Sequence, residues 1–215
     1  MKMKKLVLLL FVAVATFVNG QNASLEQAIK EGLTLLDSAK TIEDMQAVVS
    51  KFERVALVES SRWEPTYYLA YTQINLSFWE TEGAKKDAIL DLAEKNIEKA
   101  LTLNGDKSEL YALQGFLYQG RIQVSATRGM TYSMKASEIL EKALEENPEN
   151  PRAQFLMAQN IFHTPKMFGD GAKNALPQFL EAKEKFEKEN GKNGINPSWG
   201  ARANQRMIDA CNKDN

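Results

Sequence analysis

Side chains that could carry out catalysis are few and widely separated in this 215-residue chain. The only histidine, His163, and the only cysteine, Cys211, lie far apart in the sequence. Nucleophilic catalysis needs a base beside its nucleophile, and a zinc site needs several His or Cys ligands. The Gly-Asp-Gly at 169–171 lacks the pattern of a phosphate-binding loop. The sequence therefore predicts no enzyme activity, no metal site and no cofactor.

The abundant carboxylates are typical of solvated helix faces rather than of acid–base pairs. Two groups recur at helical spacing with lysines between them: Glu141, Glu145 and Glu146, and then Glu181, Glu184 and Glu187. With 27 basic and 28 acidic residues, the formal net charge is −1. Binding to a phosphate backbone depends on an excess of basic residues. We therefore expect no nucleic-acid partner.

The N-terminal segment has the features of a secretory signal peptide. Lys2, Lys4 and Lys5 precede an apolar run from 6 to 18, and Val18-Asn19-Gly20 offers a cleavage site before Gln21. This run is shorter than the ~20 residues that span a membrane. We expect residues 1–20 to be removed and residues 21–215 to form a single exported domain, soluble in the periplasm or outside the cell. Removing three lysines changes the formal charge from −1 to −4, and the one remaining cysteine excludes an internal disulfide.

The remainder of the chain reads as helices throughout. Long periodic segments rich in Ala, Leu, Glu and Lys are separated by most of the glycines and prolines, and no segment alternates with a period of two. Asp106 or Ser108 can cap one helix, and Asn150 followed by Pro151 can start another. The expected helices are 24–38, 42–58, 65–79, 84–102, 107–123, 132–146, 150–162, 171–189 and 198–212.

Three of these helices repeat the same order of small and large residues at i, i+4 and i+7. The series are Ala93, Ile97, Ala100; Ala136, Leu140, Ala143; and Ala175, Phe179, Ala182. Small residues let a neighbouring helix approach closely, and the large residue between them fills the gap. The preceding helices carry compact residues of their own, Ala70, Gly115 and Ala158. The pattern therefore predicts repeated helical hairpins. Gly105 and Pro148 are expected to end the helices that contain Ala100 and Ala143.

This pattern resembles the tetratricopeptide repeat (TPR), over residues 64–189 and more weakly over 24–58. The stretches "TQINLSFWE", "YQGRIQV", "NPRAQFLMAQNIFHTPKMFGDG", "ALPQF" and "NPSWG" are similar to secreted TPR-type proteins of the Bacteroidetes, a group to which the resemblance attaches no activity. It implies an all-α, right-handed α-solenoid of about four antiparallel hairpins plus a C-terminal capping helix. Repeats of this family run ~34 residues, and the longer spacing here predicts enlarged loops near 80–86, 123–131 and 163–170 along one edge.

The resemblance also predicts a concave groove lined by the first helix of each hairpin. Aromatic rings beside polar groups make a reasonable recognition surface for a peptide or protein. Alternatively, Tyr67, Phe116 and Phe155 pack between the repeats or under the last helix. The predicted partner-binding residues are Glu64, Tyr67, Tyr71, Asn75, Phe116, Arg152, Phe155, Gln159 and His163.

The enlarged loops are a second candidate surface. One brings Arg121 and Arg128 close to Met130 and Tyr132, and such an edge could bind an acidic group. Alternatively, Arg121 pairs with a local carboxylate and the apolar tip of the last loop folds back onto the hairpin. The loop-edge candidates are Arg121, Arg128, Lys166, Met167 and Phe168.

Two functions remain open. The first is a non-enzymatic exported scaffold for a protein or peptide segment, bound on the concave face or the loop edge, without insertion into a membrane. The second is a small-ligand carrier or transporter accessory of the cell envelope. In both, the last helix should cap the stack through Trp199, Ala203, Met207 and Ala210, because a terminal repeat lacks a neighbour.

Overall fold

The computed structural model describes residues 23–165, 171–189 and 194–213. The expected signal peptide lies outside these residues. An initial helix covers 23–38. The helices that follow are α2 (Ile42–Val58), α3 (Trp63–Trp79), α4 (Gly83–Thr102), α5 (Lys107–Ile122), a short 3₁₀ turn η1 (Ala126–Arg128), α6 (Gly129–Glu146), α7 (Pro151–Phe162), α8 (Gly171–Glu189) and α9 (Ala201–Lys213).

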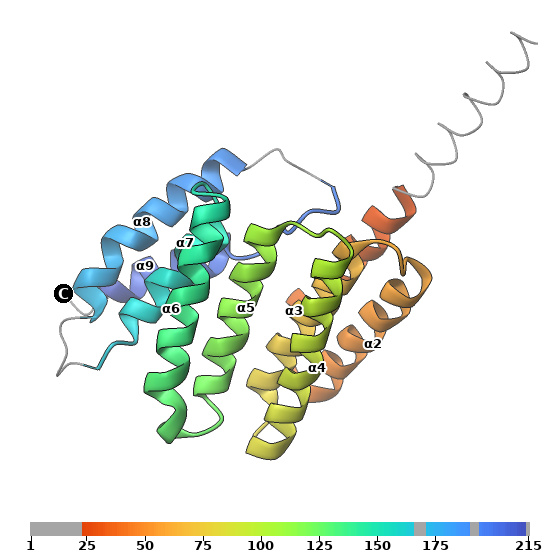
Figure 1. The fold of residues 1–215 in the computed structure, drawn as a ribbon, viewed down its shortest axis with the longest axis horizontal. Helices are drawn as coiled ribbons and strands as arrows, with labels where there is room; N and C mark the ends of the chain where they lie inside the picture. Colours follow the sequence, from red (N-terminus) through yellow and green to blue (C-terminus); the bar gives the residue numbers. More distant parts are fainter. Residues whose placement is uncertain (1–22, 166–170, 190–193, 214–215) are drawn as a thin grey trace, which may run out of the picture.

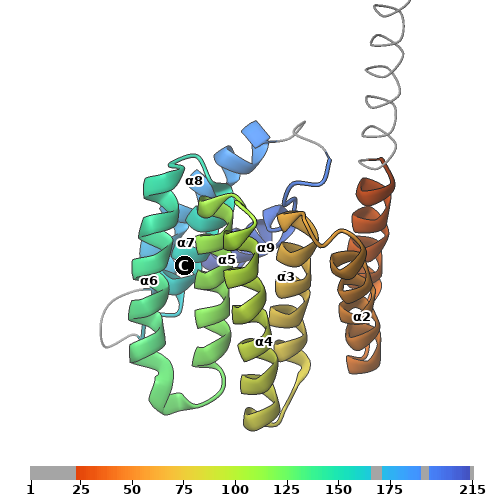
Figure 2. The same ribbon diagram turned by 45° about the vertical axis from the view of Figure 1, so that its right-hand side comes forward.

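Successive helices pair as antiparallel hairpins and stack side by side. Helix 23–38 leads into α2, and α3 with α4, α5 with α6 and α7 with α8 form the next three pairs (Figure 1). The second view shows the same layered stack (Figure 2). Helix α9 packs against α8. The all-α solenoid of about four hairpins with a terminal capping helix is therefore confirmed.

The predicted small residues lie where the helices approach most closely. Ala93, Ala136 and Ala175 are all fully buried. A methyl group placed on Gly115 would come 2.6 Å from the Leu140 side chain. The compact residue of one helix thus contacts the large residue of its partner, and Gly32 against Phe52 repeats this arrangement in the first hairpin.

Local capping follows the sequence at the starts of α5 and α7. Asp106 accepts a hydrogen bond from the Glu109 backbone N–H at 3.0 Å, so Asp106 rather than Ser108 caps α5. Asn150 caps α7 by accepting from the backbone of Arg152 and Ala153, with Pro151 in the first turn. These side chains satisfy N–H groups that have no partner inside the helix.

The stop after α4 differs in detail from the expectation. Asn104, not Gly105, adopts the left-handed conformation, with φ 57°. Gly105 is needed for close approach instead, because a Cβ there would lie 2.8 Å from the Ala100 carbonyl oxygen. The Gly105 N–H donates to that same oxygen at 3.0 Å and closes the helix end.

The extra length of each repeat goes partly into longer helices. The connection between α3 and α4 covers only 80–82, because α4 begins at Gly83. The connection between α5 and α6 covers 123–128 and includes η1. Both lie at the lower edge of the stack in Figure 1. Of the third predicted loop, 163–165 is described and 166–170 lies outside the described residues.

The last helix starts later than predicted and turns a different face inward. It begins at Ala201 rather than at 198, after Gly200 with φ +109°. Its buried residues are Asn204, Ile208 and Cys211. The predicted face of Ala203, Met207 and Ala210 is offset by one position and lies half-buried beside them.

The apolar core forms two clusters, one from the initial helix 23–38 through α5 and one from α5 through α9. Phe116 and Trp199 pack against both clusters and join them. Within the described part of the chain, no helix combines the length and apolar character needed to cross a membrane.

Candidate functional site

The predicted concave groove is filled by the chain's own C-terminal segment. The Trp199 ring stacks on Tyr71 with ring centroids 4.7 Å apart and lies 5.7 Å from Phe116. The Trp199 Nε1–H donates to the Tyr67 hydroxyl at 2.9 Å. Tyr67, Tyr71 and Phe155 are buried, and burial raises the pKa of both tyrosines. This surface is therefore packed by aromatic rings and is not open.

A buried ion cluster lies beneath the same surface. The Arg152 guanidinium donates to both oxygens of Glu109, at 2.7 and 2.8 Å, and reaches Glu189 at 2.6 Å. The Tyr67 hydroxyl donates to Glu109 at 3.4 Å. Burial raises the pKa of Glu109, although the positive charge of Arg152 opposes the shift. The hydrogen bonds of this cluster connect side chains of α3, α5, α7 and α8.

The other predicted groove residues also make local contacts. Glu64 pairs with Arg62 at 2.9 Å, and the Asn75 amide donates to the Tyr71 carbonyl at 2.8 Å. Gln159 is half-buried on α7. Contact with a partner through the groove residues stays a prediction, and at Tyr67 and Tyr71 it requires Trp199 to move. His163 differs from them because it is exposed at the end of α7.

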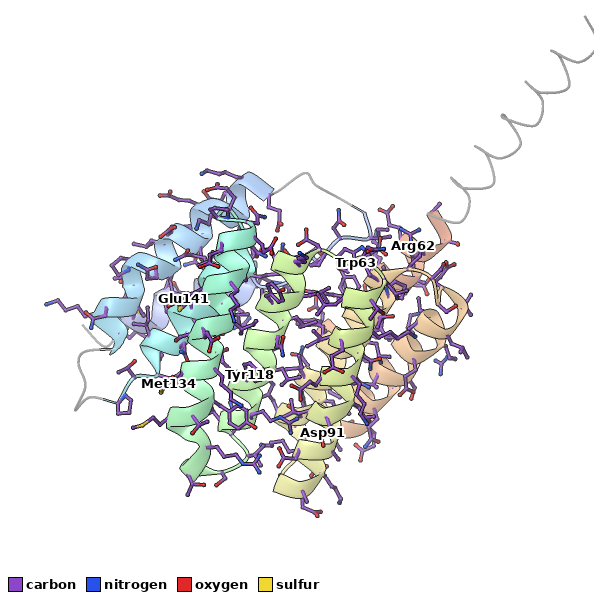
Figure 3. The ribbon with its side chains drawn as sticks, in the orientation of Figure 1. Arg62, Trp63, Asp91, Tyr118, Met134 and Glu141 are labelled. Carbon is purple, nitrogen blue, oxygen red and sulfur yellow. The ribbon has the colours of Figure 1, made fainter. Side chains whose placement is uncertain are left out.

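At the loop edge, the two predicted arginines are paired. Arg121 is buried and donates to Asp87 at 2.7 Å, to Asp91, and to Glu94 at 3.3 Å. Arg128 donates to both Asp87 oxygens at 2.8 Å. Asp91 lies on α4, at the side of the molecule that Figure 3 shows. These interactions hold the connection between α5 and α6 against α4. They match the alternative that Arg121 pairs with a local carboxylate. Lys166, Met167 and Phe168 lie outside the described residues.

Next to these arginines, the start of α6 and the end of α7 enclose a hollow of about 580 Å³. This volume lies within the range of about 300–1,000 Å³ that small-molecule sites occupy. We call this hollow the rim pocket. Met130 and Met134 are about 70% exposed beside it, and Figure 3 labels Met134 on α6. The rim pocket is lined by Ile122, Gly129, Met130, Ser133, Met134, Asn160, His163, Thr164 and Pro165.

The polar residues of the rim pocket fix the spacing of α6 and α7. The Asn160 amide donates to the Ser133 carbonyl at 3.0 Å and to the Ser137 hydroxyl at 2.7 Å. The Ser133 hydroxyl donates back to the side-chain Oδ1 of Asn160 at 3.1 Å. Because these groups satisfy one another, the accessible remainder of the pocket is mainly methionine and aliphatic surface together with the His163 ring.

Sequence reasoning named His163 and the neighbouring loop but missed Met134, Ser133 and Asn160. The spacing of the two methionines in the sequence is consistent with an exposed apolar site. Met130 and Met134 are one helical turn apart and lie off the buried face that Ala136, Leu140 and Ala143 define. Exposed apolar side chains gathered at one place are typical of a binding surface.

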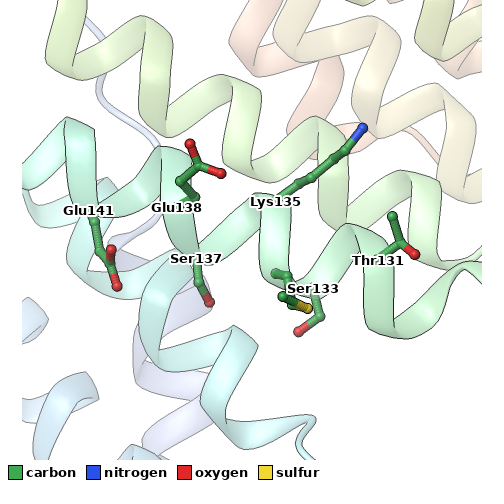
Figure 4. A pocket seen from close by; sticks show the side chains of 7 residues that line it. Thr131, Ser133, Lys135, Ser137, Glu138 and Glu141 are labelled. Carbon is green, nitrogen blue, oxygen red and sulfur yellow. The ribbon is translucent and has the colours of Figure 1, made fainter.

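A second, more open hollow continues along α6. It has a volume of about 600 Å³ and shares Ser133 and Met134 with the rim pocket. Ser133 and Ser137 point to one side of the helix, whereas Lys135 extends away from them (Figure 4). Lys135 lies over the Tyr132 and Tyr118 rings, 5.3 and 6.0 Å from their centroids. The charged residues Glu138 and Glu141 make this surface a weaker candidate for an apolar ligand than the rim pocket.

No cluster of His, Cys, Asp or Glu among the described residues could hold a metal ion by itself. A ligand of the rim pocket would therefore meet methionine sulfurs, aliphatic groups and one imidazole. Such a surface suits an apolar molecule with a few polar groups.

Comparison with known proteins gives two relevant neighbours. No family model and no curated protein matches the sequence. Among solved structures, the HusA haemophore from Porphyromonas gingivalis is similar, with 31% identity over 89% of this chain and 92% of that chain and a TM-score of 0.77. A thermophilic TPR protein of Thermus thermophilus aligns over 88% of this chain and 99% of its own, at 15% identity and a TM-score of 0.52. The second likeness shows the fold, and together they confirm the resemblance to TPR-like proteins of the Bacteroidetes.

Proposed function

Because this chain belongs to the family of the HusA haemophore, we propose that it is an exported, non-enzymatic carrier that binds haem or a closely related tetrapyrrole in the rim pocket. The identity of 31% across nine-tenths of both chains is the observation that carries this proposal. It develops the small-ligand function that the sequence left open. Export rests on the signal-like N-terminal segment.

The chemistry of the rim pocket suits a tetrapyrrole. Such a ring is flat and apolar and carries carboxylate groups at its edge. Met130 and Met134 offer flexible, polarisable side chains that adapt to a flat face. They are exposed when the pocket is empty, so a ligand that covers them removes apolar surface from water.

The N-terminus of α6, at the same rim, would provide a positive electrostatic potential for the carboxylate groups of the ligand. Helix α6 begins at Gly129, and its N-cap, Arg128, provides no side-chain hydrogen bond to the first turn. The N-terminus of a helix carries partial positive charge. A carboxylate at this position would be stabilised while the ring lies against the methionines.

Binding of a protein segment in the concave groove remains the other candidate from the sequence. It has less support, because Trp199 already packs against that surface. A segment bound there would have to displace these contacts, whereas a ligand of the rim pocket displaces none of them.

Absorbance titration of the mature chain with haem and with metal-free protoporphyrin tests this proposal. We expect saturable binding, weakened at least about tenfold, or ~1.4 kcal/mol, in a Met130→Glu, Met134→Glu variant, because charges then face the apolar ring. The matched control is Leu57→Glu, Val58→Glu on α2, whose side chains are also exposed, by 78% and 80%. Absence of binding to either compound would reject the function, and equal affinities of the two variants would reject the rim pocket.

A further inference from the structure

Two methionines at the rim pocket are open to solvent. Met130 and Met134 lie one helical turn apart on α6, are 70% and 69% exposed, and both line the pocket. The other methionines among the described residues are less exposed. Met45 is buried, and Met157 and Met207 are half-buried. A reagent in solution should therefore reach the two thioethers of the pocket first.

The thioether sulfur of methionine is oxidised by peroxides. With hydrogen peroxide, the sulfur lone pair attacks one peroxide oxygen and the O–O bond breaks. Sulfur is oxidised by two electrons to the sulfoxide. The proton on the transferred oxygen joins the leaving hydroxide, which departs as water. The only cysteine, Cys211, is fully buried, so an exposed thiol does not compete for the oxidant.

A sulfoxide changes the surface that the rim pocket offers to a ligand. Its oxygen accepts hydrogen bonds from water while the pocket is open, and a ligand that covers it removes that water. The Asn160 amide and the Ser133 hydroxyl, which are donors at this pocket, already bind each other and Ser137. Burial of a polar group without a hydrogen bond is unfavourable. An apolar ligand should therefore bind the oxidised pocket more weakly.

Oxidation at these two positions should leave the fold intact. Both methionines lie off the buried face of α6, which consists of Ala136, Leu140 and Ala143. Oxidation of Met45 would instead place a polar group in the apolar core. The α6 pair therefore allows a change in ligand affinity without a change in stability.

Resting on the proposed function, we propose that Met130 and Met134 form a reversible oxidation site that controls the affinity of the rim pocket for its apolar ligand. Peroxide converts both side chains to sulfoxides before it reacts with the other described methionines, and the ligand is released. Enzymatic reduction of the sulfoxides restores the thioethers and the affinity. The pocket thus holds its ligand under reducing conditions and releases it where peroxide is present.

The mature wild-type chain is treated with hydrogen peroxide, freed of the reagent and titrated in the dark with metal-free protoporphyrin. We expect peptide mass analysis to find the added oxygen on Met130 and Met134 before Met45, Met157 and Met207. The affinity should fall at least about fivefold. Methionine sulfoxide reductases that act on both sulfoxide epimers should return it to its starting value. Thermal melting should show the same transition before and after treatment.

Two variants test whether the effect comes from the α6 pair. Met130→Leu, Met134→Leu cannot form these sulfoxides, so its affinity, whatever its starting value, should not change on treatment. Met157→Leu, Met207→Leu keeps the α6 pair and should lose affinity as wild type does. Met167, which lies outside the described residues, is retained in both variants and cannot explain a difference between them.

Three results would overturn the oxidation site while leaving the carrier function intact. They are oxidation of the α6 pair after the other methionines, an unchanged affinity of the oxidised wild type, and an equal loss of affinity in Met130→Leu, Met134→Leu. Untreated wild type that binds neither protoporphyrin nor haem would overturn both proposals.

Discussion

At the residue scale, the fold depends on small side chains placed opposite large ones. Gly115 on α5 faces the buried Leu140 on α6, and the space between them leaves no room for a methyl group. Packing at this density makes even one added carbon costly. The same positions gave the clearest signal in the sequence, because spacing and residue size together define a close helix contact.

We expect Gly115→Ala to lower the free energy of unfolding by about 1–3 kcal/mol, since its Cβ would lie 2.6 Å from two Leu140 carbons. Urea denaturation followed by circular dichroism measures this change. Gly129→Ala is the matched control, because nothing lies within 4 Å of a Cβ at that helix start. It should be neutral or slightly stabilising, by up to about 1 kcal/mol. Equal effects of the two substitutions would contradict the close-contact explanation.

At the element scale, buried charges fix how the hairpins meet. Arg152 on α7 joins Glu109 on α5 to Glu189 on α8. The sequence placed Arg152 on the inner face of its helix but could not reveal its partners. Glu109 is 43 residues away, and one sequence contains no signal that links two such positions.

Replacing Arg152 with Met should destabilise the fold by about 3–5 kcal/mol at pH 7, because it leaves the buried Glu109 carboxylate without its partner. Burial already raises the pKa of Glu109 above its usual 4.5, and loss of Arg152 raises it further. Between the Glu109 pKa of the unfolded chain and the higher Glu109 pKa of the folded variant, the folded variant retains a proton that the unfolded chain releases. The free energy of unfolding of the variant therefore falls as pH rises between these two values. The difference in free energy of unfolding between wild type and Arg152→Met should therefore be larger at pH 7 than at pH 5.

Urea denaturation at both pH values measures this dependence. Adding Glu109→Leu to the Arg152→Met variant removes the unpaired charge and should recover part of the loss. Arg202→Met, which breaks the exposed pair with Asp37, is the control for a general charge effect. A loss in Arg152→Met that does not change with pH would count against the titration of Glu109.

At the scale of the whole molecule, the C-terminal segment unites two halves of the core. Phe116 and Trp199 are the residues that pack against both apolar clusters. The sequence predicted a capping helix at the end of the stack, and α9 has that role against α8. The alternative that Tyr67 packs under the last helix is of this kind, but the sequence did not identify Trp199 as the residue that contacts Tyr67, 132 positions away.

Trp199→Ala should reduce stability by about 3 kcal/mol through loss of ring packing and of the hydrogen bond to Tyr67. The urea transition should also broaden, since the two clusters then unfold less cooperatively. Trp79→Ala is the control, because that ring is exposed at the end of α3. Two variants with the same transition midpoint and slope would show that Trp199 does not join the clusters.

Fold and site differ in how much of them the sequence could predict. The hairpins follow from local spacing, so Ala93, Ala136 and Ala175 were placed correctly. The rim pocket depends on where α6 begins relative to the end of α7, which follows from packing between helices. His163 and the nearby loop could therefore be named, whereas their pairing with Met134 and Asn160 required coordinates.

The rim pocket lies at helix ends, away from the contacts that hold the hairpins together. Substitutions at Met130, Met134 or His163 leave the close helix contacts untouched, because these side chains are largely exposed. Under the proposed function, a descendant of this protein could therefore exchange one ligand for another through a few surface changes. The stack of helical hairpins would stay the same while the ligand preference of the rim pocket changed.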